Sequence, residues 1–281
     1  MTAQPFDRRV TPARPDLAAA PLEGHFEASR FVIGERRVVV APTAPLRREP
    51  RLDCSLDTEA LRGESLTVYE ETSEGWAWVQ LSSDGYVGYL PAEALGPTEV
   101  STDKVAVLRT LVFPGPDLKL PVCGALTLGS RVAVREIVRG YARIAEGFVW
   151  AAHLAPLDAV EADFVSVAER FMGVPYLWGG KSSLGLDCSG LVQVSLAAAQ
   201  VQAPRDSDMQ ERDLGSVLPP EIPLMRGDLV FWRGHVGIMR DATALLHANA
   251  HAMMVSSEPL AVARARIREK TGVDVTTVKR L

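Results

Sequence analysis

The sequence predicts a multidomain protein in which two small β-barrels precede an α+β domain. Short β-branched and aromatic segments, separated by turn signals, run through residues 26–157, and this pattern is typical of small barrels. From residue 158 the apolar residues adopt helical spacing, and strand-like segments follow them. At 281 residues the chain has room for two or three domains.

Residues 1–25 contain four prolines and are expected to form an extended, partly disordered arm that either covers a neighbouring domain or stays mobile. They lack the apolar core of about 7–15 residues that marks a secretory signal. No part of the chain approaches the roughly 18 consecutive apolar residues of a membrane-spanning helix. We therefore expect a cytoplasmic protein with no membrane partner.

Residues 26–98 are predicted to form the first barrel. The segments "RRVVVAP", "ESLTVYEE", "GWAWVQL" and "GYVGYLP" have the composition of strands, and "TSEG" and "SSDG" that of turns. Residues 99–157 repeat this order more faintly in "KVAVLRT", "SRVAVREIV", "YARIAEG" and "FVWAAHL". Because "ALRGESLTVYEE" aligns with "ALTLGSRVAVRE", we predict two barrels in tandem.

Residues 158–281 are predicted to form the α+β domain. "AVEADFVSVAERFMG" has helical spacing and a glycine stop, and "DCSGLVQVSLAAAQ" indicates a second helix with Asp187 at its N-cap. "GDLVFWR", "HVGIMR", "ALLHANA" and "AMMVSSE" indicate strands with tight connections. A helix in "EPLAVARARIREKTG" and a strand in "DVTTVKRL" close the chain, so helices come first and an antiparallel sheet follows.

Charge and cysteine content exclude several classes of function. A net charge of −5 and a pI near 5.6 are unsuited to nucleic-acid binding, which needs a basic surface. Cys54, Cys123 and Cys188 lie far apart and form no CxxC pair. We therefore expect neither a disulfide framework nor a structural zinc site.

Cys188 falls in the first turn of the helix predicted for "DCSGLVQVSLAAAQ". Unpaired amide groups and the helix dipole favour negative charge there, so we expect a thiol with a lowered pKa. The thiolate is the nucleophilic form of cysteine, and the same amide groups can hold an oxyanion during acyl transfer. The alternative for an isolated cysteine is a buried structural thiol.

Two histidines belong to neighbouring predicted strands. His235 opens "HVGIM", and His247 ends "ALLH". A turn near residues 240–243 would place both rings on one face, with His235 as general base and His247 orienting its ring. The alternatives are two unrelated histidines, or a zinc site with Cys188 that would lack a fourth ligand.

Other residues near Cys188 along the chain are further candidates. Tyr176, in "PYLWGG", can donate a hydrogen bond to an oxyanion or simply pack beside Trp178. Asp206 and Ser207, in "PRDSDMQ", can meet the polar end of a substrate, and the alternative is a solvated loop.

The segments "PYLWGGKSSLGLDCSGLVQ", "APRDSDMQ", "RGDLVFW", "GHVGIM" and "LLHANA", in this order and spacing, closely resemble the NlpC-type cysteine peptidases. This resemblance covers residues 158–281 and implies a papain-like domain. The preceding barrels resemble bacterial SH3-like domains, whose motifs are weaker. The fold class implied is two small SH3-like β-barrels followed by an α+β papain-like cysteine peptidase domain. This layout is similar to that of cytoplasmic γ-D-glutamyl-L-diamino acid endopeptidases.

The resemblance implies a catalytic set. Cys188 would attack an amide carbonyl, His235 would be the base, His247 would orient it, and Tyr176 would support the oxyanion. Asn249, in "ANAHAMMV", is an alternative orienting group, as in papain-type sites. We favour His247 because the predicted strand register places it opposite His235.

The resemblance also implies substrate-binding residues. Asp187, Ser189 and Ser207 would bind the free amine of an N-terminal L-Ala, since a carboxylate and two hydroxyls match the three donors of an ammonium group. In such enzymes the first SH3-like domain closes one end of the groove. Tyr86 is then a candidate wall residue, with barrel packing as the alternative, and Glu59 a weaker candidate near the amine, with surface charge as the alternative.

These features predict a thiol hydrolase of murein tripeptides or tetrapeptides that begin L-Ala-γ-D-Glu. It would cut the bond between the D-Glu side-chain carboxyl and the next diamino acid, with no metal or organic cofactor. Two alternatives stay open: a non-catalytic protein that binds wall fragments through its barrels, and an amidase or acyltransferase acting on another amide. The sequence makes no choice between lysine and diaminopimelate at the third position, nor among recycling, nutrient use and defence, and it predicts no oligomeric state.

Overall fold

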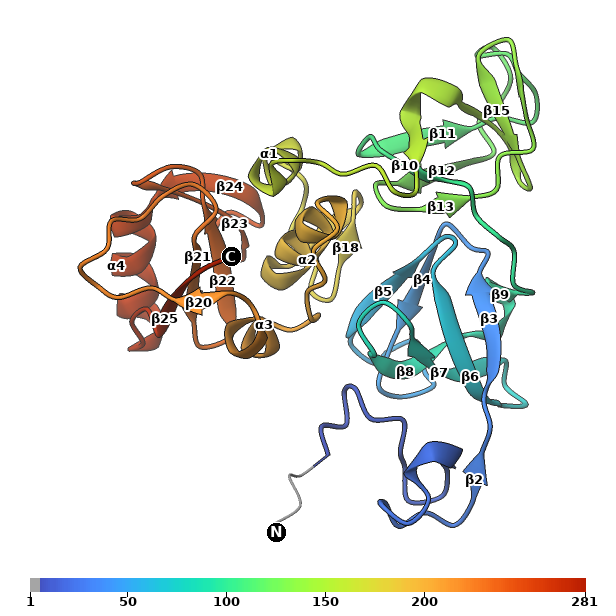
Figure 1. The fold of residues 1–281 in the computed structure, drawn as a ribbon, viewed down its shortest axis with the longest axis horizontal. Coiled ribbons are helices and arrows are strands. Elements are labelled where there is room, and N and C mark those ends of the chain that lie inside the picture. The colour runs from blue at the N-terminus through green and yellow to red at the C-terminus, as the bar shows by residue number, and fades with distance from the viewer. Residues whose placement is uncertain (1–5) are drawn as a thin grey trace. The chain divides into compact units, whose positions relative to one another are not determined.

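The computed structural model describes residues 6–281, so residues 1–5 of the predicted N-terminal arm lie outside the described part. The chain divides into two compact units, with the boundary between Leu157 and Asp158. In the described residues all four α-helices belong to the second unit, whereas the first is built from strands and short 3-10 turns (Figure 1). None of the described helices has the length and apolar character needed to span a bilayer.

The described part of the N-terminal arm lies against the first barrel. β1 (Ala18–Ala19) pairs in parallel with β2 (Phe31–Val32). Leu17 is fully buried in a hydrophobic cluster with Trp78 of the barrel. The guanidinium of Arg14 lies over the same indole ring, 4.3 Å from its centre. Burial of Leu17 and this cation–π contact therefore hold the arm to the barrel surface.

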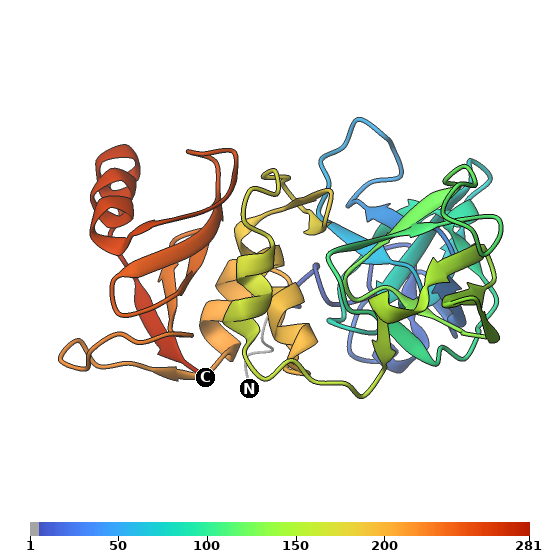
Figure 2. The same cartoon turned by 90° about the horizontal axis from the view of Figure 1, so that it is seen from above.

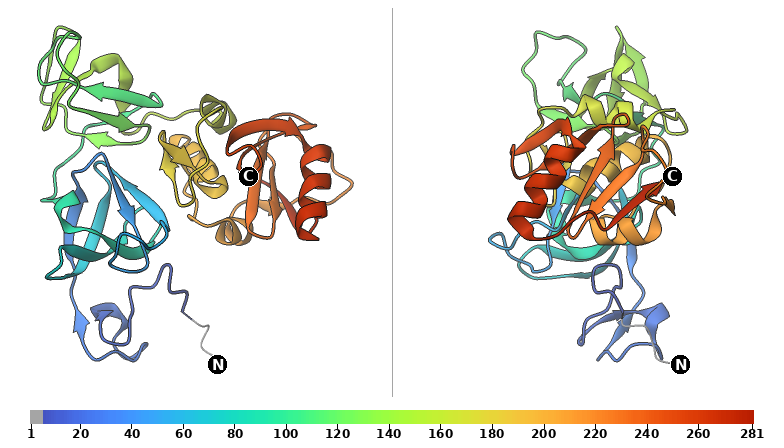
Figure 3. Two further views of the ribbon diagram at one scale, coloured as in Figure 1. Left: turned by 180° about the vertical axis from the view of Figure 1, so that it is seen from behind. Right: turned by 90° about the vertical axis from the view of Figure 1, so that its left-hand side faces the viewer.

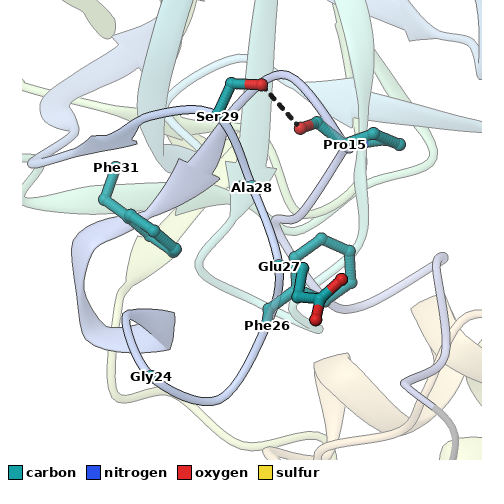
Figure 4. A pocket seen from close by; sticks show the side chains of 7 residues that line it. All are labelled: Pro15, Gly24, Phe26, Glu27, Ala28, Ser29 and Phe31. Atoms are coloured by element: carbon teal, nitrogen blue, oxygen red, sulfur yellow. Dashed lines mark hydrogen bonds between the residues drawn. The ribbon is translucent and has the colours of Figure 1, made fainter.

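A hollow lies beside the segment that joins β1 to β2 along the chain, as Figure 4 shows. The hydroxyl of Ser29, one of its lining residues, donates to the carbonyl oxygen of Pro15 at 3.3 Å. The only ionisable side chain among the lining residues is a single glutamate, so the hollow offers little chemistry. Its lining residues are Pro15, Gly24, Phe26, Glu27, Ala28, Ser29 and Phe31.

The first barrel consists of a five-stranded sheet, in the order β8-β7-β6-β3-β9, and the hairpin β4-β5. One hydrophobic cluster fills it, and Tyr86 belongs to that cluster with 5% of its surface exposed, which is the packing named as its alternative. Glu59 on β5 is buried, not a surface charge. The strands are β3 (Glu35–Val39), β4 (Thr43–Leu46), β5 (Thr58–Leu61), β6 (Ser65–Glu71), β7 (Trp76–Leu81), β8 (Val87–Pro91) and β9 (Leu95–Gly96).

The strands of residues 103–156 repeat this arrangement around a hydrophobic cluster of their own. Hairpin β11-β12 corresponds to β4-β5, and the meander β14-β15-β16 corresponds to β6-β7-β8. Gly63 and Gly129 occupy matching turns with φ of 80° and 84°, a conformation that favours glycine. The strands are β10 (Asp103–Val105), β11 (Arg109–Val112), β12 (Gly124–Thr127), β13 (Arg131–Val132), β14 (Glu136–Val138), β15 (Tyr141–Ile144), β16 (Gly147–Trp150) and β17 (Leu154–Pro156).

The second unit is a six-stranded antiparallel sheet, in the order β20-β25-β21-β22-β23-β24. This sheet lies between α4 on one side and α1 and α2 on the other (Figures 1 and 2), and α4 crosses its face (Figure 3). The elements are α1 (Phe164–Arg170), β18 (Lys181–Ser182), β19 (Gly185–Leu186), α2 (Cys188–Ala198), α3 (Ser207–Asp213), β20 (Ser216–Val217), β21 (Leu229–Trp232), β22 (His235–Met239), β23 (Ala244–Asn249), β24 (Met254–Pro259), α4 (Leu260–Thr271) and β25 (Thr277–Arg280).

Two helices differ from the sequence prediction. The first begins at Phe164, not near residue 158, because the Asp163 side chain caps it by accepting the N–H of Val165 at 2.9 Å. Residues 204–210 are predicted to form a polar loop, but the part from Ser207 onward belongs to α3. Met209 is buried on one side of α3, and this packing stabilises a helix whose composition is otherwise polar.

Gly190 lets the start of α2 lie against the preceding loop. A Cβ at this position would meet the carbonyl oxygen of Gly180 at 2.2 Å and Oδ1 of Asp187 at 2.9 Å. Both contacts are too close, and the first is with backbone, which cannot move aside cheaply. The helix and the loop can approach this closely only because residue 190 has no side chain.

We predict that Gly190→Ala destabilises the protein by about 1–3 kcal/mol through this overlap. The same change in an unobstructed helix would instead stabilise by up to about 1 kcal/mol. As a control, Ala197→Gly, at an exposed position of α2, should lose roughly 0.5–1 kcal/mol through helix propensity alone. Urea unfolding of both variants measures the two changes, and a gain for Gly190→Ala would contradict the close approach.

Candidate active site

The carboxylate of Asp187 fastens the start of α2. As the N-cap residue, it accepts the N–H of Gly190 on Oδ1 at 2.7 Å, and its Oδ2 accepts the N–H of Gly179 at 2.9 Å. The two bonds join the helix to the loop before it. They therefore fix the position of Cys188, which is the first residue of the helix.

Arg205 binds the same carboxylate from a third segment. The residue is 1% exposed, and its guanidinium donates to Oδ1 of Asp187 at 2.9 Å and to Oδ2 at 2.7 Å. It also donates to the hydroxyl of Ser189 at 2.9 Å. This bidentate pair is the arrangement that compensates two buried charges most effectively.

Sequence reasoning considered Asp206 and Ser207 in "PRDSDMQ" but missed the arginine before them. The available signal was Asp187, a lone carboxylate at the start of an otherwise apolar helix, since a buried charge requires a partner. In the structure Asp206 and Ser207 are half-buried at the start of α3. Asp187 is engaged with Arg205, so an ammonium group would have to share that carboxylate with the guanidinium.

The sulfur of Cys188 lies at the start of β22, and the residue is 8% exposed. Backbone N–H groups of Val236 and Ser189 hydrogen-bond to it and favour the thiolate. Burial and the nearby charge of Asp187 outweigh them, so the pKa of the Cys188 thiol is raised to about 12. The expectation of a lowered pKa, drawn from the helix terminus alone, is wrong because it ignored desolvation.

His235 and His247 are in direct contact. Nε2 of His235 lies 2.8 Å from Nδ1 of His247, and the ring centres are 5.1 Å apart. β22 and β23 are antiparallel neighbours in which Ile238 pairs with Leu246. Each histidine is an odd number of residues from that pair, so both side chains point to the same face. They meet diagonally across the two strands, not directly opposite each other as expected.

A carboxylate missed in the sequence extends this contact. Nε2 of His247 lies 2.9 Å from Oε1 of Glu258 on β24. Arg266 on α4 donates to Oε2 of Glu258 at 2.6 Å and also to Oε1. The site therefore contains an ordered series of His235, His247, Glu258 and Arg266, drawn from three adjacent strands and the helix that follows them.

Both imidazoles favour the neutral state. Burial, followed by His247 and Arg266, lowers the pKa of His235 to about 3. Burial also lowers the pKa of His247, although the hydrogen bond to Glu258 opposes it. The pKa of Glu258 is lowered to about 2, mainly because Arg266 donates to it. Near neutral pH the resting site therefore combines a thiol, two neutral rings and one carboxylate held by an arginine.

Tyr176 and Asn249 are the two remaining candidates, for support of the oxyanion and for orientation of His235. Burial, together with the nearby Cys188 and Asp187, raises the pKa of Tyr176, so its hydroxyl keeps its proton and can act as a donor. Trp178, the expected packing partner, is 63% exposed. Asn249 accepts the N–H of Ala252 at 2.8 Å and so caps a turn, whereas His247 contacts His235.

Residues 6–281 contain no group of three or more His, Cys, Asp or Glu side chains arranged to hold a metal ion. The arrangement that the second unit does contain is suited to nucleophilic chemistry. A sulfur at a helix start, together with two hydrogen-bonded imidazoles, can transfer an acyl group.

Two family models match the chain. The model described as the bacterial dipeptidyl-peptidase SH3 domain matches residues 46–95, within the first barrel. The model described as the NlpC/P60 family matches residues 173–268. This range includes Cys188 and the hydrogen-bonded series His235, His247, Glu258 and Arg266.

The chain is also similar to individual proteins of the same family. The gamma-D-glutamyl-L-lysine dipeptidyl-peptidase of Bacillus cereus is 26% identical over 205 residues, which cover 63% of this chain but only 60% of that protein. The probable endopeptidase NlpC of Escherichia coli is 31% identical over 106 residues, 35% of this chain and 68% of that protein. The crystal structure of an NlpC/P60 family protein from Bacillus cereus shares the fold, with a TM-score of 0.72 at 20% identity, over 88% of this chain and 99% of that one.

The ion pair of Arg205 leads to a stability prediction. Because Arg205→Met leaves a buried carboxylate without its partner, we expect the free energy of unfolding to fall by about 3–5 kcal/mol. Arg264 makes a bidentate pair with Asp274 but its side chain is 56% exposed, so Arg264→Ala should cost less than about 1 kcal/mol. Urea unfolding of the full chain compares the two, and equal small losses would show that Arg205 is not needed.

The raised pKa of Cys188 leads to a prediction for alkylation. Since only the thiolate reacts, a higher pKa means less thiolate at pH 7, and labelling by iodoacetamide should accelerate by roughly tenfold per pH unit between about pH 7 and 10. Peptide mass spectrometry separates Cys188 from the exposed Cys123, which serves as an internal comparison and should be labelled first at pH 7. A rate for Cys188 that levels off below pH 8 would instead indicate a resting thiolate.

Proposed function

The chain belongs to the NlpC/P60 family of cysteine peptidases, and from this premise we propose that it hydrolyses the γ-D-glutamyl bond of short murein peptides. The substrate would begin with a free L-Ala, followed by γ-D-Glu and a diamino acid, and the product would be L-Ala-γ-D-Glu. The observation that carries the proposal is the position of Cys188, at a helix start and hydrogen-bonded by the residue after His235. The name of the Bacillus cereus relative and the dipeptidyl-peptidase SH3 match support this choice of substrate.

In the first half of the proposed reaction, Cys188 attacks the γ-carbonyl carbon of D-Glu and its proton passes to His235. Both groups are neutral at rest, so proton transfer accompanies the attack and need not precede it. The N–H of Cys188 at the start of α2 and the hydroxyl of Tyr176 would stabilise the oxyanion. His235 then gives the proton to the departing amine of the diamino acid, which leaves a thioester on Cys188.

In the second half, His235 takes a proton from water, and the resulting hydroxide attacks the thioester carbon. The carbon–sulfur bond breaks, the proton returns to Cys188, and L-Ala-γ-D-Glu is released. The steps consume one water and leave the protein unchanged, so the proposal requires no cofactor. His247 orients His235 throughout.

Recognition of the free amine is proposed to involve Ser207 most directly. Asp187 and Ser189 are bound by Arg205, which favours a positioning role for them at the edge of the amine subsite. Asp206, which precedes Ser207 at the N-cap of α3, is proposed to supply a carboxylate beside it. This assignment replaces Asp187 as the main counter-charge because Asp187 already balances a guanidinium.

We also propose that residues 103–156 form a second SH3-like domain. The family match covers only the first barrel, and the support for the second is its repeated strand order and matching turn glycine. A spacer is the simplest role for it. The cytoplasmic location stays a prediction from the sequence.

The proposed reaction predicts that the purified full-length protein releases L-Ala-γ-D-Glu from L-Ala-γ-D-Glu-L-Lys or from its diaminopimelate counterpart. Cys188→Ala should reduce the rate by at least about 1000-fold, because no other group can form the thioester. Mass spectrometry of the products measures both. Full activity in Cys188→Ala would exclude the mechanism, and binding of either tripeptide without cleavage would favour the wall-fragment binder.

The same assay tests recognition of the amine. N-acetylation removes the ammonium group, so the acetylated tripeptide should be cut much more slowly than the free one. Equal rates on the two peptides would favour an amidase or acyltransferase that does not read the N-terminus.

A further inference from the structure

The carboxylate of Glu258 closes a series of hydrogen bonds that determines where each imidazole carries its proton. Its side chain is 18% exposed, and that of His247 is fully buried, so water does not compete readily for their contact. Arg266 approaches from α4 and contacts both oxygens of Glu258. An ionised carboxylate held by a guanidinium accepts hydrogen bonds and has no proton to donate.

The direction of every bond in the series follows from this acceptor. Because Glu258 can only accept, Nε2 of His247 must donate to it across 2.9 Å. A neutral imidazole carries one proton, so Nδ1 of His247 has a lone pair and accepts from Nε2 of His235 across 2.8 Å. The proton of His235 is then on Nε2, and its lone pair is left on Nδ1.

We propose that Glu258, held by Arg266, is a positioning residue that fixes the tautomers of His247 and His235 and so makes Nδ1 of His235 the basic atom. This inference rests on the proposed function only in assigning the base role to His235. It adds a fourth and a fifth residue, on β24 and α4, to the predicted Cys188, His235 and His247.

The opposite arrangement shows what Glu258 prevents. A donor in its place would turn Nε2 of His247 into an acceptor and move that proton to Nδ1. His247 would then donate to Nε2 of His235, and the proton of His235 would move to Nδ1. The nitrogen that should remove a proton would be blocked, although every distance in the series could stay the same.

Nuclear magnetic resonance tests the tautomers without any substrate. The chain contains five histidines, so two-bond proton–nitrogen correlations of the full-length protein with ¹⁵N-labelled histidine are tractable at neutral pH. We expect a proton on Nε2 and a lone pair on Nδ1 for both His235 and His247. A proton on Nδ1 of either ring would overturn the inference, whatever the substrate of the protein is.

A set of variants separates positioning from simple stabilisation. In Glu258→Gln, which can present an amide donor, kcat on the cleaved tripeptide should fall roughly 10- to 100-fold with KM unchanged. Arg266→Met retains the acceptor and should lose less activity. Glu269→Gln, the same chemical change at an exposed position of α4, is the matched control and should retain full activity.

The double variant Glu258→Gln with Arg266→Met decides between the two roles. It leaves no unpaired charge, so it should regain stability relative to Glu258→Gln alone while kcat stays low. Recovery of kcat in the double variant would show that Glu258 merely neutralises Arg266, and the inference would fail. If neither tripeptide is cleaved by the wild type, the proposed substrate is wrong, and the resonance experiment still decides the inference.

Discussion

The carboxylate of Asp187 is the constraint on which the candidate site depends. It binds the loop at Gly179, the start of α2 at Gly190 and the guanidinium of Arg205. A carboxylate this deeply buried is tolerated only when its charge is paired and its oxygens are hydrogen-bonded. Since Cys188 is the next residue, the position of the sulfur is set by whatever holds Asp187.

Further bonds extend this constraint to α3. Nε2 of Gln210 donates to the carbonyl oxygens of Ser189 and Pro204, each at 2.9 Å. Arg205 lies between these segments and is bonded to both Asp187 and Ser189. The polar segment before α3 is thus joined to the first turn of α2. Positioning of the proposed nucleophile therefore depends on three chain segments and not on one helix.

The electrostatics of the site differ from those of a pre-formed thiolate and imidazolium. Burial raises the pKa of Cys188 and lowers that of His235, so each group is neutral at rest. In the proposed reaction the proton therefore moves as the sulfur attacks, when negative charge passes to an oxyanion near the helix start. The hydrogen bonds from His235 to His247 and Glu258 are important in such a site, because a neutral base acts only through the nitrogen that has the lone pair.

The sequence by itself determined the order of the main strand segments along the chain, the helix start near Cys188, the N-cap at Asp187 and the placement of His235 and His247 on neighbouring strands. These features arise from residue periodicity, capping and turn chemistry, which act within a few residues. Only the tertiary structure decided that Arg205 balances Asp187, that Glu258 and Arg266 stand behind His247, and that burial raises the pKa of Cys188. Charge pairing between distant segments and desolvation of buried groups depend on which surfaces pack together. No local pattern in the chain specifies that packing.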